Sequence, residues 1–147
     1  MEATIYNRHT SFNKRGKPAI MRIDAHNGNA RIQLSVEAVK LLELQEGDCL
    51  SFVTLPTDKE AVYFCVDNKD GFHLKVCTEH KSGVDMGIFC RQLARKLLDH
   101  LGINSMRSFI VTTEKVPVQL NGKTVKMFFI DKHKTYSGKF KPNSKIS

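Results

Sequence analysis

The sequence lacks the long apolar segments that mark membrane and exported proteins. No stretch approaches the run of about 20 apolar residues that a membrane helix needs. The first residues, MEATIYNRHTSFNKRGK, are polar and contain no apolar stretch of the signal-peptide type. We therefore expect a cytoplasmic protein that makes no contact with a membrane.

Cysteine is scarce, and its spacing excludes the common zinc and redox motifs. The four cysteines form no C-x-x-C pair. Each one lies in an apolar stretch, so we expect small buried side chains in a reducing compartment rather than a disulfide framework. The residues concerned are Cys49, Cys65, Cys77 and Cys90.

Motifs of the common catalytic sites are also absent. No Gly-rich phosphate loop, H-E-x-x-H or G-x-S-x-G occurs, and the six histidines are scattered without metal-ligand spacing. His73 and His80 flank a strand end and could approach Cys77 or Asp85, but exposed loop histidines are the simpler interpretation. We predict a protein that is not an enzyme and that uses no cofactor and no metal.

What is present indicates a folded domain. The 147 residues, of which 41% are hydrophobic and 26% charged, are enough to bury a core and argue against wholesale disorder. The chain corresponds to one ordinary domain or to two small intertwined halves.

Positive charge is concentrated at the two ends of the chain. The formal net charge is +8. Residues 1–23 contain five bases and one acid, residues 132–147 contain five lysines and no acid, and the segment between them is close to neutral. We therefore divide the chain into a basic N-terminal arm (1–18), a body (19–131, with units 19–67 and 72–131) and a basic C-terminal tail (132–147).

Basic arms on a neutral body favour a polyanionic partner, because each neutralised phosphate releases counterions. The C-terminal tail also interleaves aromatic side chains with lysines, which suits stacking on unpaired bases. Basic tails serve equally well for solubility or for docking onto an acidic protein partner. The residues predicted to bind nucleic acid are Lys14, Arg15, Lys17, Arg22, Arg31, Lys132, Lys134, Tyr136, Lys139, Phe140 and Lys141.

Local patterns predict eight strands and two short helices. The first helix follows a cap at Ser35 and runs over 36–44, and the second covers 91–101 and stops at Gly102. The sequences HNGN and Asn121-Gly122 are typical of hairpin turns. The strands are expected at 18–24, 30–34, 49–55, 61–67, 71–77, 86–90, 108–113 and 125–131.

The order strand, strand, helix, strand, strand occurs twice, which indicates an internal duplication. The two predicted helices align at a constant offset of 56, with Ala38 matching Ala94 and Leu42 matching Leu98. Chance similarity between two amphipathic helices is the alternative. The expected core contains Leu41, Leu44, Phe52, Phe64, Leu97, Leu101, Phe109 and Phe128.

The segment ARIQLSVEAVKLLELQEGDCLSFV resembles the central motif of the AbrB/SpoVT-like swapped-hairpin family. The matching features are a polar helix cap, a short helix with a Leu-x-Leu ending and a Gly-Asp turn, here Leu34-Ser35-Val36-Glu37, Leu42-Glu43-Leu44 and Gly47-Asp48. The resemblance implies a mainly β fold with two short helices, in which the duplicated units form a pseudo-twofold swapped-hairpin barrel. It also implies DNA contacts from basic residues on the hairpin before the helix. This chain offers Arg22 and Arg31 there, and Lys75 and Lys81 in the second unit.

Together these features predict a small non-enzymatic nucleic-acid-binding protein, a DNA-binding module of the transcription-regulator kind, which could form an oligomer. The alternative is a structural or protein-interaction component of a phage or mobile element with no direct nucleic-acid role. A small enzyme without a recognisable motif ranks third.

Overall fold

The computed structural model describes residues 17–137. This part of the chain is mainly β, with two helices. The helices are α1 (Val36–Leu41) and α2 (Arg91–Leu101). The strands are β1 (Ile20–Asp24), β2 (Arg31–Leu34), β3 (Cys49–Leu55), β4 (Asp58–Val66), β5 (Phe72–His73), β6 (Lys75–His80), β7 (Gly83–Ile88), β8 (Arg107–Ile110), β9 (Val116–Leu120) and β10 (Lys123–Asp131).

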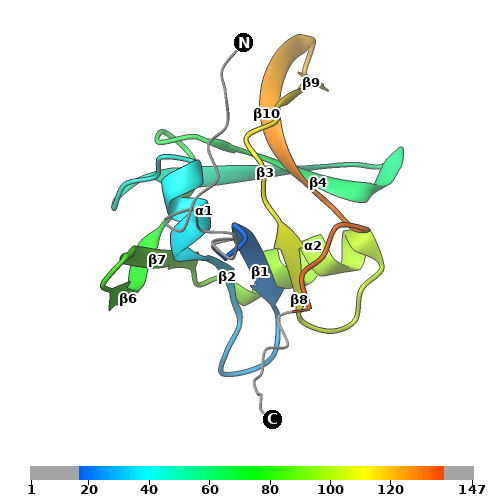
Figure 1. Cartoon of the computed structure of the whole chain (residues 1–147). Helices are drawn as coiled ribbons and strands as arrows, with labels where there is room; N and C mark the ends of the chain where they lie inside the picture. Colours follow the sequence, from blue (N-terminus) through cyan, green and yellow to red (C-terminus); the bar gives the residue numbers. More distant parts are fainter. Residues whose placement is uncertain (1–16, 138–147) are drawn as a thin grey trace, which may run out of the picture.

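The strands form two five-stranded sheets, one above the other in Figure 1. Sheet I has the order β6-β7-β2-β1-β8, and sheet II has the order β5-β3-β4-β10-β9. Each sheet sets a hairpin from the first half of the chain beside a hairpin from the second half. In sheet I, β2 pairs with β7, and in sheet II, β4 pairs with β10, both antiparallel.

The sequence predicts a closed or nearly closed barrel, and a closed barrel is not present among these residues. The strand ladders end at β6 and β8 in sheet I and at β5 and β9 in sheet II, and the short segment 134–136 that follows β10 pairs with the outer side of β8. Helix α2 packs against β1 of sheet I and β4 of sheet II, so a helix rather than a strand ladder links the two sheets there. Backbone hydrogen bonding therefore does not run continuously around the core, and the barrel prediction was wrong on this point.

Two more strands occur than the sequence predicts. The Asn121-Gly122 turn has positive φ at both residues, 48° and 83°, and it joins β10 to β9 in a region predicted as a loop. The predicted strand at 71–77 divides into β5 and β6, because Leu74 is buried and its N–H donates to the carbonyl of Asp48. The first hairpin has its turn at HNGN, where Gly28 has a φ of 88°.

Both predicted helices form, but the first is shorter than expected. Ser35 caps α1 by accepting a hydrogen bond from the Ala38 N–H at 3.2 Å. The helix ends at Leu41 because Glu43 adopts a φ of 56° and turns the chain back. Helix α2 has the predicted bounds and ends at Gly102, which has a φ of 71°.

The core lies between the sheets and under the helices, where alternate strand residues point inward. Five of the eight predicted core residues are buried, namely Leu44, Phe64, Leu97, Leu101 and Phe109. Phe52 and Phe128 are half-buried and pack against the core, with their rings next to that of Phe64. The assignment of Leu41 was wrong, because the six-residue α1 buries Val36, Ala38 and Val39 and leaves Leu41 39% exposed.

The prediction of buried cysteines is confirmed only for Cys49. All four cysteines are free thiols, with Cys49 buried and the other three half-buried. Neither helix in residues 17–137 has the length and apolar character needed to cross a membrane.

Candidate functional site

The outer face of sheet I, the side that points away from the core, gathers polar side chains from four strands. Along β1, Met21 and Ile23 point into the core, so Arg22 between them points outward. Arg22 lies opposite Gln33 of β2 on one side and opposite Ser108 of β8 on the other. Asp85 of β7 belongs to the same face, because its neighbour Met86 is buried opposite Leu34.

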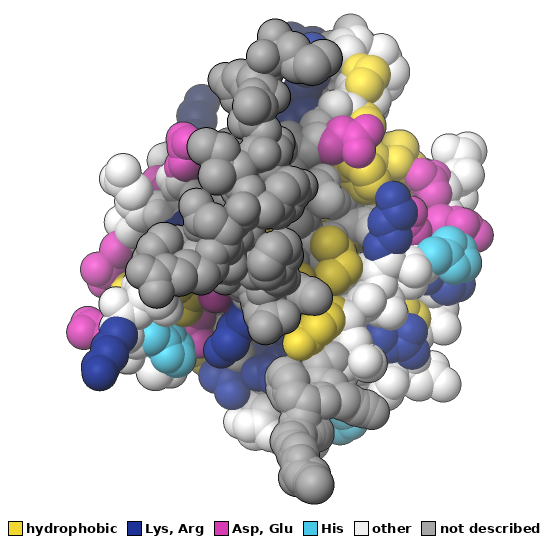
Figure 2. Space-filling view, viewed as in Figure 1, with side chains coloured by type: hydrophobic (Ala, Val, Ile, Leu, Met, Phe, Trp, Pro, Cys, Tyr) yellow, Lys and Arg dark blue, Asp and Glu magenta, His cyan; other side chains and the backbone are white. Residues whose placement is uncertain are grey.

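A cleft of about 490 Å³ opens on this face. It brings together three of the predicted nucleic-acid-binding residues from separate parts of the sequence: Lys17 before β1, Arg22 in β1 and Tyr136 after β10. Figure 2 shows a group of Lys and Arg side chains in the lower centre of the molecule, in the region that β1 and β2 occupy in Figure 1. The other lining residues include two acids, Glu37 and Asp85, and three apolar residues, Ile20, Val36 and Met106.

A chain of hydrogen bonds fixes the floor of the cleft. Arg22 Nη2 donates to Gln33 Oε1 at 3.0 Å, and Gln33 Nε2 donates to Asp85 Oδ2 at 2.9 Å. The other oxygen of Asp85 accepts the Thr78 N–H at 2.7 Å, and His80 Nε2 lies 3.5 Å from Oδ2. Asp85, only 9% exposed, is thus surrounded by donors, and His80 approaches it, although the sequence favoured an exposed loop histidine at this position.

Arg22 is held by a neutral amide and not by an acid. Within residues 17–137, no carboxylate lies close enough to Arg22 for an ion pair. Asp24, two residues along the strand, is engaged by His26, and the positive charge of Arg22 contributes to lowering the pKa of Asp24. The guanidinium is therefore positioned by Gln33 while its charge stays available to a ligand.

The described part of the C-terminal segment is bound to the body. The Tyr136 N–H donates to the Ser108 carbonyl, and the Ile110 N–H donates to the Lys134 carbonyl, so the segment follows β8 and brings Tyr136 to the cleft. Lys132 does not line the cleft. Its Nζ lies 3.9 Å from the position that a Cβ atom would take at Gly102, which places this ammonium group at the C-terminal end of α2. There it complements the helix dipole.

The other predicted residues fall into two groups. Lys134 is exposed, and Arg31 lies on the outer face of sheet I without lining the cleft. Five predictions lie outside the described residues, namely Lys14, Arg15, Lys139, Phe140 and Lys141.

Arg31 forms a second feature of the outer face together with Phe89, which the sequence analysis missed. The guanidinium carbon of Arg31 lies 5.7 Å from the centroid of the Phe89 ring. The two residues meet because Ile32 pairs with Ile88, which places Arg31 opposite Phe89 on the outward side. A Cβ at Gly87 would be 3.0 Å from Cys77 Sγ, a tight contact, so the glycine gives room beside the Cys77 and Phe89 side chains. The sequence signal was the alternation Met86, Ile88, which points Phe89 outward.

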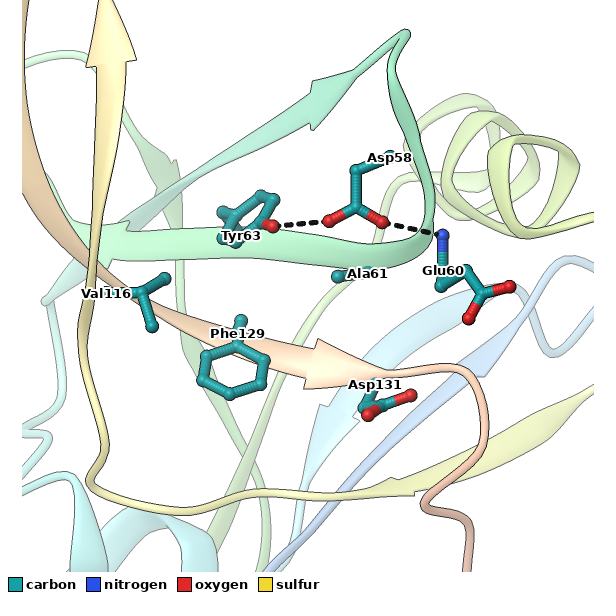
Figure 3. Close-up of a pocket in the computed structure, with 7 residues that line it drawn as sticks. All are labelled: Asp58, Glu60, Ala61, Tyr63, Val116, Phe129 and Asp131. Carbon is teal, nitrogen blue, oxygen red and sulfur yellow. Dashed lines mark hydrogen bonds between the residues drawn. The ribbon is translucent and has the colours of Figure 1, made fainter.

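Sheet II carries a smaller hollow of about 200 Å³ whose character is acidic (Figure 3). The Tyr63 hydroxyl donates to Asp58 Oδ2 at 2.6 Å. This bond raises the pKa of Tyr63 to about 12 and lowers the pKa of Asp58. Glu60 and Asp131 also line the hollow, which makes it unsuitable for phosphate groups.

Sheet II also contains a cysteine–histidine pair. Cys49 Sγ lies 3.3 Å from His73 Nδ1, a pair that the sequence did not indicate. Cys49 is buried, however, which leaves little access for a substrate. The described residues contain no cluster of three or more side chains able to hold a metal ion.

Comparisons with protein-family models, with curated proteins and with solved structures give no match for this chain. The chemistry of the outer face of sheet I is therefore the basis for a functional proposal.

Proposed function

We propose that this chain is a small nucleic-acid-binding protein, a cytoplasmic DNA-binding module without enzymatic activity, that holds phosphate groups against the outer face of sheet I. The observation that carries the proposal is the convergence of Lys17, Arg22 and Tyr136 on one cleft. These residues come from distant parts of the chain, and Arg22 has no carboxylate partner among residues 17–137. The acids of the cleft are Glu37 and Asp85, and Asp85 is already engaged by Gln33 and Thr78, so Lys17 and Arg22 are the groups that would meet an anionic backbone.

We also propose that the two halves of the chain arose by duplication, in a variant of the AbrB/SpoVT-like arrangement. Neighbouring hairpins from the two halves in both sheets support this proposal. In sheet II, Phe64 pairs directly with Phe128, its counterpart in the sequence repeat. The hairpin before α1 carries Arg22 and Arg31, the position from which the resemblance implies DNA contacts.

A protein-interaction role is the second candidate. A hollow of about 520 Å³ is lined by Leu41 and by Val66, which is 42% exposed, beside Lys115 and Lys126. Apolar side chains bordered by lysines suit an acidic protein partner. This surface would fit a structural component of a phage or mobile element with no nucleic-acid role.

The test of the first proposal is the salt dependence of binding. Fluorescence anisotropy with labelled duplex DNA should show affinity that falls steeply with salt. Replacing Arg22 by Ala should weaken binding and make the slope of log affinity against log salt less steep by about 0.9 if Arg22 meets one phosphate. The matched control is Lys59→Ala, which removes the same charge from exposed β4 of sheet II and should leave the slope unchanged. Absence of any binding to DNA or RNA by the intact chain would overturn the proposal in favour of the protein-interaction role.

A further inference from the structure

Phe89 is an exposed aromatic residue in a fixed position. It is 53% exposed, more than any other large hydrophobic residue in residues 17–137. It directly follows β7 and precedes Cys90, the N-cap residue of α2, so regular structure holds the backbone on both sides. Its ring is therefore accessible to a ligand on the outer face of sheet I.

The charge beside this ring is not neutralised by the nearest acid. Asp24 is the cross-strand partner of Arg31, but Asp24 Oδ1 lies 2.7 Å from His26 Nδ1 and accepts the His26 N–H at 2.9 Å. In the described part of the chain, Arg31 takes part in no ion pair. Its other neighbour is the Cys77 thiol, whose pKa is raised mainly by burial and lowered in part by Arg31.

Strand β2 connects the Phe89 ring to the cleft, because it carries both Arg31, which contacts the ring, and Gln33, which lines the cleft. Arg31 and Gln33 lie on the same side of β2, and Arg22 donates a hydrogen bond to Gln33. Two residues along a strand span about 7 Å and neighbouring strands lie about 5 Å apart, so Phe89 beside β2 and Arg22 in β1 are separated by one such step along the sheet and two strand spacings across it. A strand with unstacked bases could place a phosphate at Arg22 and lay a neighbouring base on the ring of Phe89. A duplex keeps its bases stacked inside and cannot do this.

We infer that Phe89 and Arg31 form a stacking site for an unpaired nucleobase, so that the chain prefers single-stranded nucleic acid to duplex. The inference rests on the proposed nucleic-acid function and specifies its ligand. Aromatic rings and guanidinium planes are the groups on which proteins stack unpaired bases, and such stacking tolerates any base sequence. Arg31 supplies both the ring contact and a charge for the adjoining phosphate.

The first experiment compares affinities by fluorescence anisotropy for labelled oligo(dT), oligo(U) and a mixed-sequence duplex. We expect Phe89→Ala to weaken oligo(dT) binding roughly 5- to 150-fold while duplex affinity stays unchanged. Phe89→Tyr keeps the ring and should restore binding. The matched control is Phe72→Ala, which removes an exposed ring from the edge of sheet II and should have no effect. The relative affinities for oligo(dT) and oligo(U) show whether DNA or RNA is the better ligand.

A second experiment detects the stacking directly. The sequence contains no tryptophan, so Phe89→Trp introduces a single indole reporter. Unlabelled oligo(dT) should quench its fluorescence in a saturable way, whereas Phe72→Trp should show no such change. Because Phe89 is exposed, these variants should unfold at the same temperature as the original chain, which circular dichroism can verify.

The outcomes separate this inference from the proposed function. If the original chain binds none of the three probes, the nucleic-acid function itself is wrong. If the chain binds but Phe89→Ala binds oligo(dT) normally, or loses single-strand and duplex binding equally, the stacking site is wrong and the nucleic-acid function stands. Binding of an acidic peptide in place of oligo(dT) at the Phe89→Trp reporter would also overturn the inference.

Discussion

At the scale of single residues, Ser35 connects two elements with one hydroxyl group. Its Oγ accepts the Ala38 N–H inside α1 and the Ile20 N–H at the start of β1, the latter at 3.0 Å. The backbone of Ser35 also donates to the Ile20 carbonyl. The hydroxyl group that caps α1, as the sequence predicts, therefore also binds the start of the first strand next to α1.

We predict that Ser35→Ala lowers the free energy of unfolding by about 2 kcal/mol, because it removes the cap and leaves the half-buried Ile20 N–H without its acceptor. Urea denaturation of the two proteins measures the difference. Ser35→Thr keeps the hydroxyl and serves as the control. A loss no larger than that of an exposed surface substitution would contradict the double role.

A second prediction concerns the Tyr63–Asp58 pair. The hydrogen bond to Asp58 raises the pKa of Tyr63 from 10.0 to about 12. Because the folded-state pKa is the higher one, the contribution of this phenol to stability is complete below pH 10 and is lost as the pH rises toward 12. The pKa of Asp58 is lowered mainly by the same bond, so the contribution of that carboxylate is lost as the pH falls through its folded-state pKa.

Ultraviolet absorbance titration of the phenols tests this prediction. The chain contains three tyrosines, and we expect Tyr63→Phe to remove a phenol that ionises near pH 12. Asp58→Asn should move the ionisation of Tyr63 back toward pH 10, because the negative acceptor is gone. An unchanged titration curve in Asp58→Asn would show that the bond is not formed in solution.

At the scale of elements, the two helices occupy matching places in the sequence repeat but bury different residues. Leu41 and Leu97 are equivalent at the offset of 56, yet Leu97 is buried and Leu41 is exposed. Helix α1 has six residues and α2 has eleven, so only α2 continues far enough to turn a full apolar stripe toward both sheets.

We predict that Leu97→Ala lowers the free energy of unfolding by about 2 to 5 kcal/mol, because it leaves a cavity between α2 and the sheets. Leu41→Ala should cost less than about 1 kcal/mol, because Leu41 already contacts solvent. Chemical denaturation of both variants gives the comparison. Equal losses at the two positions would mean that α1 is buried in the manner of α2.

At the scale of the whole molecule, the two parts of the predicted C-terminal tail need separate tests. Residues 134 and 136 form backbone hydrogen bonds with Ile110 and Ser108 of β8. Deleting the whole segment 132–147 would therefore expose an edge of sheet I as well as remove charge. Deleting only 138–147 removes Lys139, Lys141 and Lys145 and leaves those hydrogen bonds in place.

We predict that the shorter deletion makes the slope of log affinity against log salt for duplex DNA less steep by up to about 2.7, if all three lysines meet phosphates. Its unfolding temperature should match that of the full chain. The longer deletion should lower the unfolding temperature. A salt slope that is unchanged in the shorter variant would show that these lysines do not contact the nucleic acid.

The sequence by itself determined the features that depend on neighbouring residues. The bounds of α2, the Ser35 cap, the HNGN turn and the inward alternation of Met21 and Ile23 all follow from local conformational preference and periodicity. The strand β9 was missed: the Asn121-Gly122 turn was predicted, but the residues before it were assigned to a loop although Val116, Val118 and Leu120 alternate along the strand.

Only the tertiary structure decided which distant segments meet. The pairing of β2 with β7 sets Gln33 against Asp85 and Arg31 against Phe89, and it leaves two open sheets where the sequence predicted a barrel. Local patterns do not specify these pairings, because any two strands with one apolar face can pair and a shift of one residue would reverse every side chain. The choice is made by how the whole core packs, and the cleft on sheet I is a consequence of that choice.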